Sequence, residues 1–94
     1  DAFRHFAWAG LLVRDLDEAT ARKFLGAHEL DPRQPLEEKA MDEFNNEKGI
    51  QAANSILKNK NFEDYELFNE AIKEIKNGGM KILNYEKNRD KKYY

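Results

Sequence analysis

The chain of 94 residues is long enough for one domain with a small hydrophobic core. It contains no cysteine, which excludes a disulfide framework and a thiolate metal site, and no run of about 18 apolar residues of the kind that a membrane-spanning helix requires. Its net charge of -2, with 36% charged residues, does not indicate general affinity for nucleic acid.

The first predicted element is a helix over about residues 1–13, whose apolar side chains cover most of the circumference. Asp1, His5 and Trp8 share one stripe of this helix. His5 is therefore expected to point into the domain, with Asp1 one turn before it, whereas Arg4 lies about 100° round the helix. Because the helical pattern is already present at the first residue, we expect the chain to be the C-terminal part of a longer protein, and the lack of a signal peptide is then uninformative.

A second helix is predicted over about residues 18–30, after a short break in which Asp15 or Asp17 can cap the new helix. Its predicted inward face consists of residues that are three and four positions apart, namely Ala21, Phe24, Leu25 and His28. Both histidines of the chain are thus expected to face inward.

The third predicted helix spans about residues 36–58, and Pro35 suits its start. Asp42, Asn45 and Gly49 form one stripe of this helix, while Asn46 and Gly49 belong to the adjoining stripe. Asp and Asn are poor residues for the middle of a helix, and Gly costs roughly 1 kcal/mol relative to Ala. A close approach by another element at Gly49, with the polar side chains turned inward, would explain this pattern.

A fourth helix is predicted over about residues 62–76 and ends at Asn77-Gly78-Gly79. Its predicted core stripe consists of Phe62, Tyr65, Phe68 or Asn69, Ile72 and Ile75. Residues 80–85 are compatible with a short strand or a last helical turn, and residues 86–94 read as a polar tail. The predicted fold is therefore a small all-α, four-helix domain over residues 1–85.

The polar residues expected to face inward come from three successive helices: Asp1, His5, His28, Asp42, Asn45 and Asn46, with Glu29 beside His28. A buried polar group without a partner costs about 1–3 kcal/mol, so these groups either satisfy one another or serve a function. Histidine, carboxylate and amide groups together can perform general acid–base catalysis or hold a divalent cation. Taken singly, His5 could be a hydrogen-bonded core histidine, and Arg4 and Glu29 could be ordinary solvated charges.

Four motifs occur in order within residues 1–57: Asp-Ala-x-Arg-His-x-x-Trp at Asp1–Trp8, Ala-His-Glu at Ala27–Glu29, Pro-Leu-Glu-Glu-Lys at Pro35–Lys39, and Met-Asp-x-x-Asn-Asn-x-x-Gly at Met41–Gly49. Together they resemble a bacterial domain found at the C-terminal ends of large secreted or surface proteins of the polymorphic-toxin type. The resemblance implies a secreted or surface-delivered effector module, with an immunity or carrier protein as a partner. It also implies a polar cluster made of Asp1, Arg4, His5, His28, Glu29, Asp42, Asn45 and Asn46.

A weaker similarity concerns bacterial phospholipase A2, which carries Arg-His-Asp in a helix. In that enzyme the His is the base and the following Asp binds calcium. Here Arg4-His5 is followed by Phe6, so the calcium-binding Asp is missing at that place. The similarity is therefore an analogy of chemistry and does not indicate membership.

The leading hypothesis is a hydrolase-type effector domain that acts on a phospholipid or a lipid-linked phosphate, with nucleic acid as the least favoured target. His5 would be the general base, Asp42 would orient it or hold a cation, and His28 would be a second acid, base or metal ligand. Arg4, Asn45 and Asn46 would bind substrate oxygens. A divalent cation would be held by Asp1, Glu29 and Asp42.

The alternative hypothesis is a binding or delivery module in which the polar cluster is a structural core network. The two hypotheses differ in what surrounds the cluster. An enzyme should have a cleft that reaches it, whereas a structural network should be sealed and hydrogen-bonded throughout.

Overall fold

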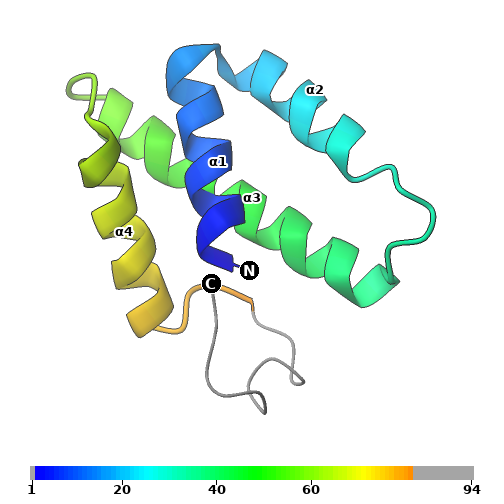
Figure 1. Ribbon diagram of the computed structural model, residues 1–94. Helices are drawn as coiled ribbons and strands as arrows, with labels where there is room; N and C mark the ends of the chain where they lie inside the picture. Colours follow the sequence, from blue (N-terminus) through cyan, green and yellow to red (C-terminus); the bar gives the residue numbers. More distant parts are fainter. Residues whose placement is uncertain (1, 82–94) are drawn as a thin grey trace.

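The computed structural model describes residues 2–81, which form four α-helices (Figure 1). The helices are α1 (Ala2–Asp15), α2 (Glu18–His28), α3 (Leu36–Leu57) and α4 (Asp64–Lys76). The predicted all-α class is confirmed, and each helix lies within two residues of its predicted bounds. No strand occurs within residues 2–81; residues 82–85 of the ambiguous segment and the predicted tail lie outside the described part of the chain.

Helix α1 is the centre of the domain and packs against each of the other three helices, most extensively against α3, which it crosses (Figure 1). Gly49 of α3 lies at this crossing, where a Cβ atom would collide with the backbone carbonyl of Phe6. Gly10 of α1 faces the side chain of Leu67 and the carbonyl of Gly49 in the same way. The close approach predicted at Gly49 is therefore confirmed, and its cause is the α1–α3 crossing.

The hydrophobic core is built around the buried face of α1, and its largest fully buried apolar side chains are Phe6 and Leu67. The predicted stripe of α4 is only partly correct. Tyr65 and Ile72 are exposed, because α4 turns Leu67 and Ala71 toward α1 instead. None of the helices in residues 2–81 is long and apolar enough to cross a membrane.

Local side-chain contacts fix where the helices begin. Asp17, one of the two predicted caps, accepts a hydrogen bond from the backbone N–H of Thr20 at 2.7 Å and caps α2. Helix α4 begins with a reciprocal capping box between Glu63 and Glu66. Pro35 occupies the position before α3, where the missing N–H of proline costs nothing.

Arg14 ties the end of α1 to the start of α4. Its guanidinium donates to Asp64 at 2.6 Å and to the carbonyl of Phe62 at 3.2 Å, and it lies over the Phe62 ring at 5.3 Å from the centroid. Replacing Arg14 with alanine is expected to lower the free energy of unfolding by about 1.5–3 kcal/mol, because charge-assisted bonds to a half-buried carbonyl are lost.

Urea unfolding followed by far-UV circular dichroism measures this effect. The matched control is Arg33→Ala, because the Arg33 side chain is 89% exposed, against 16% for Arg14, and its pair with Asp31 is a surface pair. Equal effects of the two substitutions would contradict the assignment of Arg14 as the tie between the helices.

Candidate functional site

The inward side chains of α1 and α3 meet at His5. Its Nε2 atom lies 3.2 Å from Oδ1 of Asp42, and its Nδ1 atom lies 3.3 Å from Oδ1 of Asn46. Asp42 and Asn46 are four positions apart, so both project from the same face of α3. The sequence-based prediction that these three residues come together is confirmed.

Glu29 joins this cluster from the end of α2. It is 97% buried, with a relative exposure of 3%, close to the values of 7% for His5 and 6% for Asp42. Its Oε1 atom is buried and has no hydrogen-bond partner among the residues that the structure describes. Glu29 also stands immediately after the last residue of α2, at the negative end of the helix dipole, where a carboxylate is unfavourable.

The burial of Glu29 identifies an error in the predicted face of α2. His28 and Phe24 are exposed, and the buried stripe is Ala21, Leu25 and Glu29, each four positions from the last. This narrow stripe packs helix α2 against the rest of the domain. Because successive residues are rotated by about 100° about the helix axis, His28 points away from the direction of Glu29. His28 instead makes an edge contact with the ring of Trp8, with 5.0 Å between the centroids.

Burial also changes the acid–base properties of the cluster. Loss of solvation lowers the pKa of His5, although the neighbouring carboxylates of Asp42 and Glu29 oppose this shift. Loss of solvation raises the pKa of Glu29, and repulsion from Asp42 adds to the rise. The domain therefore holds two carboxylates close together in a place where the negative charge of Glu29 is costly.

The cluster lies at the bottom of a cleft of about 660 Å³ between the start of α1, the α2–α3 connection and the start of α3. Among the residues that line this cleft are His5, Glu29 and Asp42, with Arg4 and His28 beside them. Gln34, in the connection, donates from Nε2 to the Oδ2 atom of Asp42 at 2.8 Å. Gln34 is not among the residues predicted from the sequence, because a glutamine in a turn gives no signal of its own.

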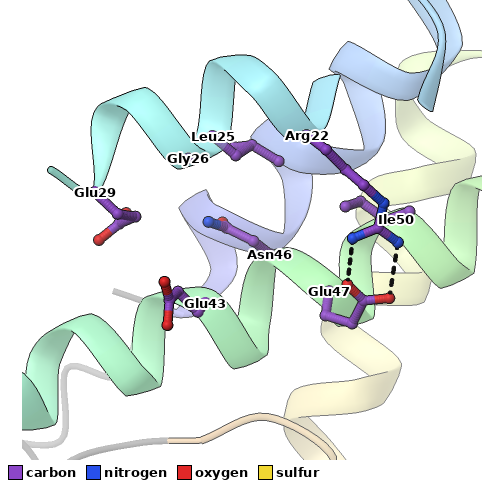
Figure 2. Close-up of a pocket in the computed structure, with 8 residues that line it drawn as sticks. All are labelled: Arg22, Leu25, Gly26, Glu29, Glu43, Asn46, Glu47 and Ile50. Atoms are coloured by element: carbon purple, nitrogen blue, oxygen red, sulfur yellow. Dashed lines mark hydrogen bonds and ion pairs between the residues drawn. The ribbon is translucent and has the colours of Figure 1, made fainter. Parts of the chain in front are cut away.

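A smaller pocket of about 210 Å³ reaches the same cluster from between α2 and α3. Figure 2 shows Glu29 of α2 and Glu43 of α3 on opposite sides of this pocket, with Asn46 of α3 deeper along it, toward Ile50. Arg22 is bound to both carboxylate oxygens of Glu47 at 2.8 and 3.1 Å, which bridges α2 and α3 at the far end (Figure 2). Glu29 thus lines both the cleft and the smaller pocket.

Asn45 does not belong to this cluster, and the prediction that it faces a common site with Asn46 is wrong. Its amide donates to the backbone carbonyl of Lys81 at 3.0 Å and accepts from the backbone N–H of Lys81 at 3.0 Å. These two bonds fasten the segment after α4 to the middle of α3. Asn45 is fully buried, so its role in the described structure is to join these two parts of the chain.

The remaining predicted residues divide into two groups. Arg4 is exposed and lines the cleft beside His5, as a group that binds substrate at the rim would. The predicted metal ligands are Asp1, Glu29 and Asp42. Asp1 lies outside the described residues, so the structure places only Glu29 and Asp42 of this set. His5 lies with these two carboxylates: one candidate ligand atom from each of the three residues lies within 4.8 Å of the others.

The comparisons with known proteins identify one family. No curated protein and no solved structure matches the chain. A match to a family extends over residues 1–79, which contain all four helices and the whole of the polar cluster. The chain belongs to the family described as Domain of unknown function (DUF6973).

Proposed function

We propose that the domain is a hydrolase that activates a water molecule where His5, Glu29 and Asp42 meet. The observation that carries the proposal is the unpartnered, buried Oε1 atom of Glu29. A domain of this size gains no stability from placing that atom beside a second buried carboxylate. An active site, by contrast, can use such a group, because a carboxylate with a raised pKa is a stronger base than an ordinary one.

The roles in this proposal differ from those in the sequence-based hypothesis. Both ring nitrogens of His5 already face protein atoms, so His5 is a positioned partner of Asp42 rather than the free base. Glu29 has the free oxygen and takes the proton from water. Asn46 and Gln34 hold His5 and Asp42 in place.

The surroundings of the cleft favour a substrate that has both an anionic and an apolar part. Two arginines, Arg4 and Arg33, line the cleft, and a guanidinium group suits a phosphate or a developing oxyanion. The lining is mixed in charge, because Arg33 is paired with Asp31 and the carboxylates of Glu29, Glu38 and Asp42 also line the cleft. A second hollow of about 560 Å³ shares Arg4, His5 and His28 with the cleft and is otherwise lined by Phe3, Ala7, Trp8, Leu11 and Phe68. A lipid ester or a lipid-linked phosphate could place its polar group in the cleft and its chain in this apolar hollow.

The biological setting follows from the motif resemblance and is part of the same proposal. The domain would be the effector part of a secreted or surface-delivered bacterial protein, and an immunity or carrier protein would be its partner. Nucleic acid remains the least favoured target, because the net charge of -2 gives no general attraction to a phosphate backbone.

The test is hydrolysis by the purified chain of p-nitrophenyl carboxylic esters, bis-p-nitrophenyl phosphate and phospholipid vesicles. Glu29→Gln, Asp42→Asn and His5→Ala should each lower kcat/KM by about 100-fold or more while far-UV circular dichroism is unchanged. Glu37→Gln removes an exposed carboxylate that is on the same helix as Asp42 and lines neither pocket of the cluster; it is the matched control, with activity expected at the parent level. Activity that persists in Glu29→Gln would overturn the assignment of the base.

A second function, a binding or delivery module with a structural polar network, is favoured by one observation. Asp42 bonds both His5 and Gln34, and the nitrogen and the oxygen of the Asn45 amide each have a partner, so most of the buried polar atoms are satisfied. In that case Glu29→Gln, Asp42→Asn and His5→Ala would destabilise the fold, and no substrate would be hydrolysed. Glu29 is the residue that this reading does not explain.

A further inference from the structure

His5 faces two acceptors, although a neutral imidazole has only one N–H to donate. Its Nδ1 atom lies 3.3 Å from the Asn46 carbonyl oxygen, and its Nε2 atom lies 3.2 Å from a carboxylate oxygen of Asp42. With the proton on Nδ1 and donated to Asn46, the lone pair of Nε2 is directed at the carboxylate. A positively charged atom bound between Nε2 and Asp42 would satisfy both groups.

Glu29 provides a third donor at the same point. Its Oε1 atom is buried without a partner, and candidate ligand atoms of His5, Glu29 and Asp42 all lie within 4.8 Å of one another. Donor atoms bound to one ion at about 2.0–2.2 Å are separated by at most about 4.4 Å. Small side-chain adjustments therefore suffice for all three atoms to contact the same ion.

We propose that His5, Glu29 and Asp42 bind one divalent transition-metal ion. This inference deepens the proposed function, and the role given to the ion rests on that function. The surrounding bonds fit such a centre. Metal-bound histidines typically donate their other ring N–H to a fixed acceptor, here Asn46, and ligating carboxylates are themselves hydrogen-bonded, as Asp42 is by Gln34.

The donor set also indicates the class of metal. One imidazole and two carboxylates suit Zn²⁺ or Mn²⁺, whereas Ca²⁺ requires six to eight oxygen ligands. Three protein ligands leave positions open for water and substrate, and the cleft gives access to them. Such an ion would lower the pKa of a water bound to it, and Glu29 would then hold the ion instead of taking the proton from water itself.

The test is calorimetric titration of the chelator-stripped chain with ZnCl₂ and with MnCl₂, which requires no turnover. The parent should bind one ion per chain and melt at a higher temperature when it is bound. Glu29→Gln should lower the affinity by about 100-fold or more. Asp42→Asn, which keeps the shape of the side chain, should have a similar effect. Glu38→Gln removes another carboxylate that lines the cleft and should leave the affinity unchanged.

The outcomes separate this inference from the proposed function. Binding of one ion that depends on Glu29 and Asp42, with no substrate hydrolysed, would support the metal site and overturn the hydrolase. Hydrolysis in excess chelator, with no ion bound, would overturn the metal site and leave Glu29 as a metal-free base. Equal affinities of the parent and Glu29→Gln would overturn the inference.

Discussion

Replacing Gly49 with alanine is expected to lower the free energy of unfolding by about 3 kcal/mol, because the new methyl group has no space at the α1–α3 crossing. Its Cβ atom would collide with the backbone carbonyl of Phe6. A backbone carbonyl cannot rotate out of the way as the end of a flexible side chain can, so α1 as a whole must move. The gain in helix propensity, roughly 1 kcal/mol, does not compensate for this displacement.

The same displacement should affect the candidate site. His5 is the residue next to Phe6, and its contacts with Asp42 and Asn46 of α3 depend on how closely the two helices approach. Urea unfolding of Gly49→Ala gives the loss of stability, and cation titration of the folded variant should show weaker binding. Gly26→Ala is the matched control, since nothing lies within 4 Å of its Cβ position, and it should raise the stability by up to about 1 kcal/mol. Unchanged stability of Gly49→Ala would show that the helices are not in close contact.

Replacing Glu29 with glutamine is expected to raise the free energy of unfolding by about 1–3 kcal/mol at a pH above the folded pKa of Glu29, although it should abolish activity. The substitution removes a buried charge that has an unpartnered oxygen and a second carboxylate beside it. The new amide can donate to Asp42, which an ionised glutamate cannot do. A gain in stability together with a loss of function is typical of a residue retained for activity.

The pH dependence of this gain has a definite sign. The pKa of Glu29 is raised in the folded chain, mainly by burial and then by Asp42, so the folded state binds this proton more tightly than the unfolded state does. The stability of the parent therefore falls as the pH rises from the unfolded pKa of a glutamate to the folded pKa of Glu29. Glu29→Gln lacks this fall, so its advantage should grow across that range and then remain constant. Urea titrations at a series of pH values measure it, with Glu43→Gln as a control that should follow the parent.

Much of the fold could be predicted from the sequence because its local signals agree. Helix boundaries coincide with Asp17, Pro35 and the segment after Lys76, and Gly49 marked the helix crossing without any knowledge of the partner helix. The buried faces of the helices were predicted less accurately than the helix boundaries. The spacing of Ala21, Phe24, Leu25 and His28 predicts an inward stripe of α2 that ends at His28, whereas the helix buries Ala21, Leu25 and Glu29.

For the site, the pairing of His5 with Asp42 and Asn46 could be predicted from the spacing of the polar residues along two helices. The separate roles of Asn45 and Asn46 could not. The two are neighbours on α3 and differ by about 100° in direction, and only the position of Lys81 shows that the Asn45 amide bonds a different part of the chain. The Ala21–Leu25–Glu29 spacing was present in the sequence and is the signal that could have placed Glu29 inside.

The most direct test of the central claim, that the buried polar cluster serves a function rather than the fold, is a comparison of urea unfolding for the parent and Glu29→Gln. It should be made in chelator at about pH 8, where the lowered pKa of His5 leaves the imidazole neutral in both states. A variant that is more stable than the parent by about 1–3 kcal/mol is the predicted result. A variant that loses several kcal/mol would contradict the claim and show that Glu29 is part of a structural network.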